Sequence, residues 1–338
     1  MTYRHILYIF TLVVTLSSCH SHRQYFPNEH QLPKVEVDII RFDSALLATT
    51  DSTIEEDIIR LYRDYPAFMP IFVEDILGIP TSDTLYLCQQ LPLFLSDTVY
   101  GFRQTNEREK EIFSSVEDIR ISLSSAFSRL VYLDSTIVVP TVYLFISGFN
   151  ASLLFLEDDI AVGADMYLGS DYEFYNKVVY EYQKYTMRKE CIPADVVSAF
   201  LFRNYPYTGT NNRLLDNLIY RGKMMYFLNQ LFPTLPEAEV MGYTQEQWQW
   251  CQRYEQDIWH LMMDKKDLFK TESIVLSSYL NDGPFTSEIS QDSPARVGTW
   301  IGWQIVESFM EHNKEVSLQE LITINDAEFI LQQSHYRP

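Results

Sequence analysis

The sequence lacks the short motifs that identify the common catalytic folds. It contains no G-x-S-x-G elbow, no P-loop, no G-x-G-x-x-G and no H-E-x-x-H. Beyond residue 34 the only histidines are His260, His312 and His335, which are far apart in the sequence and match no zinc spacing. His20 and His22 could bind a metal weakly as an i, i+2 pair, although a solvated role is the simpler interpretation. We therefore expect no cofactor, no metal site and no catalytic residue of a known type.

Basic side chains are few compared with acidic ones. Lys and Arg number 26 against 46 Asp and Glu, which gives a formal net charge of −20 at pH 7. A field of this sign repels nucleic acid and anionic lipid headgroups, so the composition argues against a nucleic-acid partner. Solubility is the simplest explanation of the acidic surface.

Cysteine is rare as well. The chain has four cysteines, and three of them, Cys88, Cys191 and Cys251, lie outside the N-terminal region. An odd number at wide spacing is no disulfide framework, so at most one bridge could form. We expect three buried thiols, because unpaired cysteine is among the most buried residue types.

Long apolar runs are missing, since no segment approaches the roughly 18 consecutive apolar residues of a membrane-spanning helix. One short apolar run, residues 6–16, follows Arg4 and leads into Leu16-Ser17-Ser18-Cys19, which is typical of a lipoprotein signal peptide with its lipobox. Residues 1–18 would then be removed, and an acylated Cys19 would anchor the mature chain to the lipid bilayer through chains such as palmitate. An ordinary secretory signal with a nearby cysteine is the alternative.

The polar segment that follows predicts how the body is attached. Residues 19–34 contain two prolines and show no periodicity, so we expect a lipidated cysteine and a polar tether. His20 occupies the position where an aspartate retains many lipoproteins at the inner membrane, which favours the outer membrane with the body facing the periplasm. Residues 35–338 are long enough to bury a substantial core, as one domain or as two lobes, a helical one over 35–130 and one with sheet and helices over 131–338.

Apolar spacing predicts a body dominated by helices. Capping boxes at Ser52-Thr53-Ile54-Glu55 and Thr244-Gln245-Glu246-Gln247 are predicted to open two helices, and apolar periodicity predicts another over residues 214–231. β-Branched runs within residues 136–162 predict a small central sheet with a hairpin, where Pro140 favours an edge position. The fold class is therefore α+β, helix-dominated, with a small central sheet packed with helices.

Acidic and aromatic residues leave two site hypotheses open. Glu157-Asp158-Asp159 together with Asp165 could supply paired carboxylates for glycoside chemistry, but acidic residues are so abundant here that a solvated turn is the simpler interpretation. The 23 Tyr, 21 Phe and 5 Trp could build a sugar-stacking platform, but their helical spacing favours a core.

The most distinctive segment of the body lies near its end. Residues 293–306 read Ser-Pro-Ala-Arg-Val-Gly-Thr-Trp-Ile-Gly-Trp-Gln-Ile-Val. Ser293 is predicted to cap a helix with Pro294 at its first position. Glycines four residues apart would let another backbone approach closely, flanked by tryptophans. The candidate packing or interaction motif comprises Ser293, Pro294, Arg296, Gly298, Trp300, Gly302 and Trp303. Burial of the motif is the simpler interpretation, and an exposed partner-binding face is the alternative.

Several segments taken together are specific for one known family. They are the lipobox at Cys19, Arg41-Phe42-Asp43, Tyr205-Pro206, residues 214–228, Tyr243-Thr244, Trp248-Gln249-Trp250-Cys251, Ile258-Trp259, Pro284-Phe285-Thr286 and residues 293–306. In this combination the chain resembles the gliding motility lipoprotein GldB family over nearly its whole mature length. Where the family pattern favours a glycine, this chain has Ala295. The resemblance implies an envelope lipoprotein associated with gliding machinery and with the accompanying secretion apparatus, and it carries over no catalytic residue.

A fainter likeness concerns the order of the predicted elements, which is similar to that of zincin-like metallopeptidases. In those enzymes the helix after the sheet carries H-E-x-x-H, whereas here residues 196–204 include Ser198 and contain no histidine. The likeness therefore implies a metal-free body of this kind. We expect a non-enzymatic structural or assembly component. An envelope hydrolase with an unrecognised carboxylate or cysteine site, and a glycan- or peptide-binding lipoprotein, are the alternatives.

Overall fold

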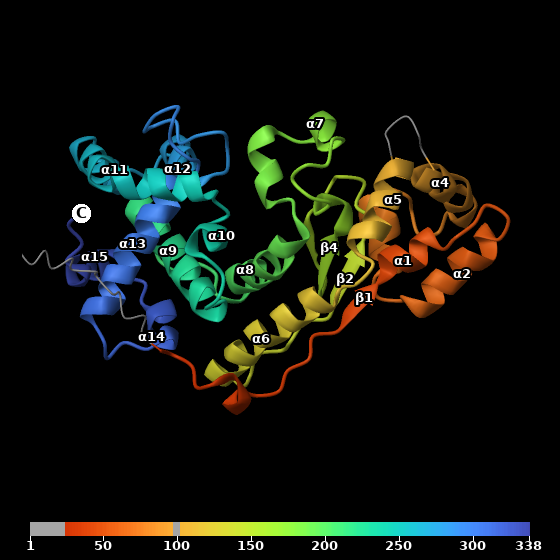
Figure 1. The fold of residues 1–338 in the computed structure, drawn as a ribbon, viewed down its shortest axis with the longest axis horizontal. Coiled ribbons are helices and arrows are strands. Elements are labelled where there is room, and N and C mark those ends of the chain that lie inside the picture. The colour runs from red at the N-terminus through yellow and green to blue at the C-terminus, as the bar shows by residue number, and fades with distance from the viewer. Residues whose placement is uncertain (1–23, 97–101) are drawn as a thin grey trace, which may run out of the picture.

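The computed structural model describes residues 24–96 and 102–338 and has a helix-dominated α+β fold (Figure 1). This confirms the predicted fold class. Its helices are α1 (Phe42–Leu47), α2 (Ile54–Asp64), α3 (Met69–Ile71), α4 (Thr84–Ser96), α5 (Phe102–Ile112), α6 (Glu117–Leu133), α7 (Tyr175–Val178), α8 (Ile192–Asn204), α9 (Leu214–Leu231), α10 (Glu237–Met241), α11 (Gln245–Asp264), α12 (Ser273–Leu280), α13 (Val297–His312), α14 (Leu318–Thr323) and α15 (Ala327–Ser334).

A small mixed sheet lies in the middle of the molecule. Its strands are β1 (Ile39–Arg41), β2 (Val142–Phe145), β3 (Leu153–Phe155) and β4 (Ile160–Gly163), in the order β1-β2-β4-β3. The first three strands of that order are parallel, and β3 is antiparallel to β4. In Figure 1, α6 and α8 lie beside the sheet toward the α9–α15 bundle, and α1, α2, α4 and α5 occupy the other end of the molecule.

Both faces of the sheet are covered, which explains the unbroken apolar runs of its central strands. Val142 and Leu144 of β2 join a large core with α6, α8, α9 and α13, whereas Tyr143 and Phe145 join a second core with α1, α2 and α4. The edge position predicted from Pro140 is wrong. β2 begins two residues after this proline and lies between β1 and β4, so Pro140 interrupts no ladder.

Two of the predicted helix starts differ from the structure. Thr53 precedes α2 but makes no cap bond to the backbone; its hydroxyl donates to Asp57 instead at 2.7 Å. Ser293 does not cap α13, which begins at Val297 after Arg296. The Ser293 hydroxyl donates to the Ser290 carbonyl at 2.7 Å, because residues 290–296 fold as a separate turn, in which residues 293–295 are buried while Gln291 and Asp292 are exposed. The capping box at Thr244 is confirmed.

The helix pair α9 and α13 forms the centre of the larger core. A Cβ atom built on Gly302 would lie 1.8 Å from the Leu218 carbonyl oxygen, and one built on Gly222 would lie 2.3 Å from the Gly302 oxygen. The two backbones therefore approach more closely than any side chain would permit. Trp300 and Trp303 of α13 are fully buried, and the Trp248 ring packs edge-on against both.

The described part of the predicted tether packs on the body, so the tether prediction is wrong for residues 24–34. The Tyr25 hydroxyl is hydrogen-bonded to that of Tyr226 at 2.8 Å, and Glu29 accepts from Arg129 at 3.0 Å. Polar composition predicted a solvated segment, but these partners on α6 and α9 hold it in place. The division of the body into two lobes stays a prediction.

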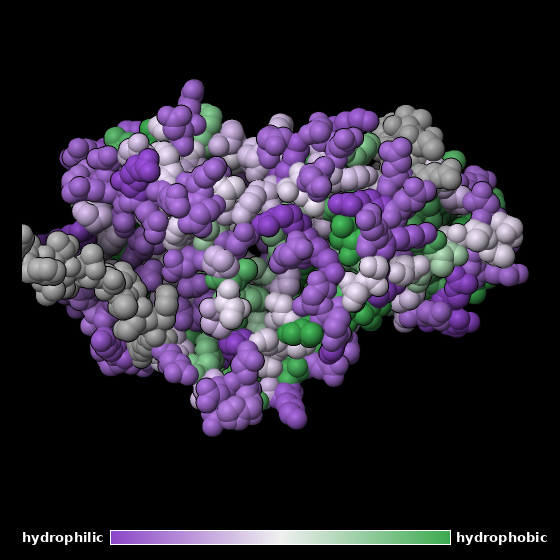
Figure 2. Space-filling view, in the orientation of Figure 1, coloured by the Kyte–Doolittle hydropathy of each residue, from purple (hydrophilic) through white to green (hydrophobic). Residues whose placement is uncertain are grey.

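The three body cysteines are free thiols, and only Cys251 is buried. The prediction of three buried thiols is thus wrong for Cys88 and Cys191, which are partly exposed. Over the described ranges, no helix is long and apolar enough to cross a membrane. Figure 2 shows a mostly hydrophilic face, as the net charge of −20 leads one to expect, with apolar patches near the sheet and around the end formed by α1–α5.

Candidate functional site

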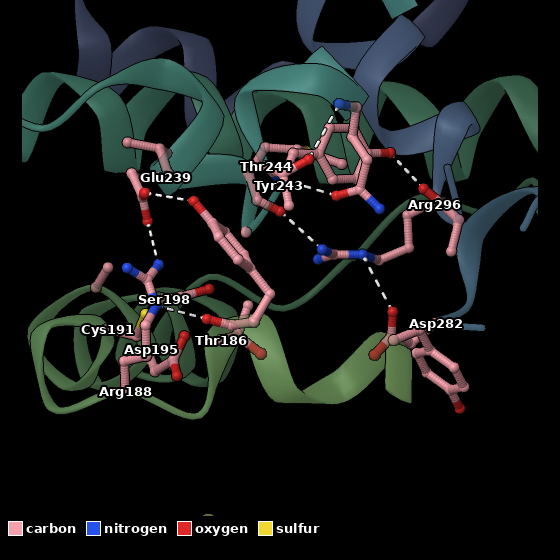
Figure 3. Close-up of a pocket in the computed structure, with 18 of the residues that line it drawn as sticks. Thr186, Arg188, Cys191, Asp195, Ser198, Glu239, Tyr243, Thr244, Asp282 and Arg296 are labelled. Carbon is pink, nitrogen blue, oxygen red and sulfur yellow. Dashed lines mark hydrogen bonds and ion pairs between the residues drawn. The ribbon is translucent and has the colours of Figure 1, made fainter. Parts of the chain in front are cut away.

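A large polar cleft separates the segment that leads into α8 from α10 and the start of α13 (Figure 3). Its volume is about 810 Å³. One wall is formed by the turn η4 (Glu181–Thr186) and by α8, and the other by α10, the loop after it and the turn before α13. Such a volume is in the range of ligand-binding sites, and the walls come from segments far apart in sequence.

An arginine–carboxylate pair joins the two walls. Arg188 donates to Glu239 of α10 at 2.7 Å, and the Tyr185 hydroxyl donates to the other oxygen of the same carboxylate at 2.6 Å. The Arg188 guanidinium also lies over the Tyr185 ring, 4.3 Å from its centroid. Burial and the neighbouring Glu239 charge raise the pKa of Tyr185 to about 12, so this phenol stays a hydrogen-bond donor. The charges in this part of the cleft therefore neutralise each other.

Helix α8 and the residue before it present three polar side chains to the cleft. Cys191, Asp195 and Ser198 are spaced at i, i+4 and i+7, which places them on one helix face. Asp195 accepts from the Tyr167 hydroxyl at 2.9 Å, and burial raises its pKa to about 6. Burial and the Asp195 charge raise the pKa of Cys191 to about 11, so its thiol stays protonated at neutral pH.

Arg296 reaches the cleft from the closing motif. Its backbone is left-handed, with φ of 59°, directly before α13. The guanidinium donates to the Met241 carbonyl at 2.7 Å, lies 5.6 Å from the centroid of the Tyr243 ring, and is 3.6 Å from Asp282. A non-glycine residue in this conformation costs on the order of 1 kcal/mol, and such strain clusters at functional sites.

We expect Arg296→Gly to be more stable than Arg296→Ala by about 1 kcal/mol. Both variants lose the side-chain contacts, but only glycine adopts the left-handed backbone at no steric cost. Thermal melts of the two variants beside the wild type check the order. Equal midpoints for glycine and alanine would contradict the strain at this position.

A smaller cavity adjoins the cleft, and aromatic side chains lie at the rim of the cleft. A neighbouring cavity of about 310 Å³ shares Thr186, Asp195 and Ser198 with the cleft and extends to Leu153 of the edge strand β3. At the rim, the Tyr180 and Tyr182 rings stack with centroids 5.7 Å apart and planes inclined by 8°. Tyr180 is 71% exposed, so one aromatic face is open to a ligand.

The structure places the sequence-predicted residues unevenly. Cys19, like His20 and His22, lies outside the described residues. Within the closing motif six residues are buried and only Arg296 is partly exposed at the cleft; the buried ones are Ser293, Pro294, Gly298, Trp300, Gly302 and Trp303. The geometry fits packing of the motif, and whether any part of it also binds a partner stays a proposal.

The other candidate residues form no shared site. Glu157 and Asp158 are exposed, and Asp159 accepts from the Thr141 amide, at the opposite end of β4 from Asp165. Across the described parts of the chain, no three His, Cys, Asp or Glu side chains are placed to hold a metal ion. The His312 and His335 rings do meet, with centroids 5.2 Å apart, a contact that their sequence separation concealed.

Sequence reasoning missed the residues that line the cleft, namely Arg188, Asp195 and Glu239. One local signal was available, because Asp195 and Ser198 interrupt the apolar residues of α8 at a spacing that puts them on one face. The partners on α10 had no such signal, since nothing local relates residue 188 to residue 239.

Comparison with known proteins agrees with the resemblance of the sequence motifs. The family model described as gliding motility protein GldB matches residues 25–338, and the match begins at the first residue that we see docked on α9. No curated protein and no solved structure matches the chain. The zincin-like likeness therefore stays a prediction. Since the family model covers almost the entire chain, the chain belongs to the gliding motility lipoprotein family GldB.

Proposed function

We propose that this chain is a non-enzymatic, lipid-anchored component of the gliding or associated secretion machinery, and that its cleft binds a segment of a partner protein. The observation that carries the proposal is the pairing of the cleft's charged groups. Arg188 is held by Glu239, Arg296 by a backbone carbonyl, and the Cys191 thiol is protonated. These groups offer hydrogen bonds and charge for recognition, without an activated nucleophile.

The rim and the smaller cavity support an elongated protein ligand. The cleft and the cavity at β3 adjoin and share Asp195 and Ser198 in their linings, and two adjoining hollows suit an extended chain rather than a compact small molecule. The stacked tyrosines at the rim supply a rigid aromatic surface, the kind that is enriched in protein interfaces.

Anchoring at the outer membrane, facing the periplasm, belongs to the same proposal. Five residues separate Cys19 from Tyr25, where the body begins. Fully extended, this spacer spans roughly 20 Å. An acylated Cys19 would therefore hold the cleft-bearing body close to the lipid surface rather than at the end of a long tether.

A photo-crosslinking amino acid at Tyr182 tests the cleft. We expect it to form an adduct with an envelope protein in intact cells, because Tyr182 lines the rim. The same amino acid at Ile59, which is 67% exposed on α2, is the control and should not form that adduct. A polysaccharide adduct at Tyr182 would favour the glycan-binding alternative. Identical products at both positions would contradict a binding role for the cleft.

One observation favours a hydrolase as the second candidate function. Asp195 lies in a cleft with a pKa of about 6, the range in which a carboxyl group acts as a general acid or base near neutral pH. Cys191 and Ser198 lie one turn away on either side of it. A substitution of Asp195 therefore distinguishes the binding function from the hydrolase.

Asparagine keeps the size and one acceptor oxygen of this side chain, so under the binding proposal Asp195→Asn lowers function in a gliding or secretion assay only in part, whereas loss of an acid–base group would abolish it. The substitution also changes stability in a defined direction. Because the pKa of Asp195 is raised in the folded protein, its protonated form contributes stability fully below about pH 4, and this contribution is lost as the pH rises through about 6. The Tm of the asparagine variant should therefore exceed that of the wild type by a margin that grows from pH 5 to pH 7. An Asp195→Asn variant that is folded but has no function in the assay would favour acid–base chemistry instead.

A further inference from the structure

Three carboxyl groups meet at the carboxyl ends of the parallel strands, away from the cleft. Asp43 follows β1 in the Arg41-Phe42-Asp43 segment, and Asp165 follows β4. Glu109 reaches the same place from α5, which packs against the turn that holds Asp165. Side chains that follow parallel strands gather at one edge of a sheet, which explains why residues so far apart in sequence converge.

Two of the three carboxyl groups accept hydrogen bonds on both of their oxygens. Arg41 donates to both oxygens of Asp43, at 2.9 and 2.7 Å. The Ser147 and Phe149 amides donate to Asp165 at 2.8 and 2.7 Å, and the Ser147 hydroxyl adds a bond at 3.1 Å. Each of these buried groups can therefore hold a negative charge with donors around it.

Glu109 differs from its neighbours. It is 1% exposed, and neither of its side-chain oxygens has a hydrogen-bond donor. Arg41 is already committed to Asp43 and to the Phe113 carbonyl, at 2.7 Å. An ionised Glu109 would be a buried, uncompensated charge beside two other carboxylates, which is among the most costly arrangements in a protein interior.

We propose that Glu109 binds a proton in the folded protein and donates it to Asp43, so that a carboxylic acid–carboxylate hydrogen bond fastens α5 to the carboxyl edge of the sheet. The bond needs one proton and no other ligand. When the pH rises and this proton leaves, two adjacent buried carboxylates repel each other and the attachment of α5 weakens. We call the Glu109–Asp43 pair a pH-sensitive latch, since its protonation attaches α5 to the sheet. It lies at the end of the molecule opposite α9 and α13.

A proton fits this place better than a metal ion does. The oxygens of Asp43 and Asp165 already accept hydrogen bonds from nitrogen and hydroxyl donors, and only Glu109 has no donor. No metal-binding set of three or more side chains was found in the described parts of the chain, this cluster included. A cation would have to displace the Arg41 and Ser147 bonds before it could be coordinated.

The charges around Glu109 set the direction of its response to pH. Burial is the main cause that raises its pKa well above the ordinary value; the Asp43 and Asp165 charges add to it, and Arg41 opposes it. Helix α4, which also packs against α5, carries no Asp, Glu, Lys, Arg or His. The protonated group therefore stabilises the fold fully below about pH 4, and this contribution is lost as the pH rises toward the raised pKa.

Glu109→Gln tests the latch, because glutamine keeps the shape, carries no charge and can donate a hydrogen bond to Asp43. We expect its Tm to exceed that of the wild type by about 2 °C or more at pH 8.5, with a smaller difference at pH 5.5. Glu56→Gln, at an exposed carboxylate on α2, is the matched control and should show no such pH-dependent gain. A gain for Glu109→Gln that is the same at both pH values would overturn the proposal.

Two measurements on the wild-type protein give independent readouts. The infrared difference spectrum of wild type minus Glu109→Gln at pH 7.5 should contain the carbonyl band of a protonated carboxylic acid. The backbone amides of α5 should exchange their hydrogens faster as the pH rises, after the rates are corrected for the intrinsic effect of pH. If the glutamine variant fails to fold, the exchange measurement decides, and pH-independent protection of α5 overturns the latch. Elemental analysis that finds one divalent metal ion per chain, lost on Asp43→Asn, would also overturn it.

Discussion

Gly302→Ala is expected to destabilise the protein so strongly that little of it folds. The added Cβ would lie 1.8 Å from the Leu218 carbonyl oxygen, and the obstacle is backbone rather than a mobile side chain. Helices α9 and α13 would have to separate at the centre of the larger core. Overpacking in a core costs about 1–3 kcal/mol when side chains can move, and we expect on the order of 4 kcal/mol or more here.

Two other glycines provide the scale for this prediction. Gly298→Ala meets the Tyr279 Cβ and carbonyl oxygen at 3.0 Å and should cost less, because the neighbour must shift by only a few tenths of an ångström. Gly283→Ala meets nothing closer than 3.8 Å and serves as the tolerated control. Circular dichroism melts of the three purified variants make the comparison. A Gly302→Ala midpoint equal to that of Gly283→Ala would show that α9 and α13 do not touch as described.

Cys19→Ala is expected to abolish membrane anchoring. The lipobox at residues 16–19 is the predicted acylation signal, and over the described ranges no helix is long and apolar enough to cross a membrane. Two or more acyl chains hold a protein at a membrane effectively for good, whereas the unmodified chain has no comparable affinity. Fractionation of cells grown with a clickable fatty acid measures both the label and the location.

Cys88→Ala is the matched control for this experiment. It also removes one cysteine, but from α4 within the folded body, so labelling and membrane association should be unchanged. Equal labelling of Cys19→Ala and Cys88→Ala would contradict acylation at Cys19. The outcome bears on the position of the cleft, because the short spacer ties the body to the site of the anchor.

Local patterns were sufficient for much of the secondary structure. The predicted helix over residues 214–231 coincides with α9, and Thr244 opens α11 with the expected capping box. The sheet strands were found in the predicted region, with β1 contributed from residues 39–41. These features depend on periodicity and on side chains within a few residues, which is the information that a sequence displays directly.

Contacts between distant segments had to come from the tertiary structure. Pro140 predicted an edge strand, but the order β1-β2-β4-β3 puts β2 in the middle, since β1, contributed from residues 39–41, pairs with it on the side away from β4. Tyr25 looked like part of a tether until its partner on α9, 201 residues away, was in view. Composition describes a segment alone and not the surface on which it can dock.

By itself, then, the sequence determined the helix-dominated class and the family, and it predicted the lipoprotein signal and drew attention to the closing glycine–tryptophan motif. Only the tertiary structure decided where charges meet. It joined Arg188 to Glu239 across the cleft, and it brought Glu109 beside Asp43 at the end of the sheet. Burial and proximity set the protonation state of such groups, and both quantities arise only when segments with no local relation pack together.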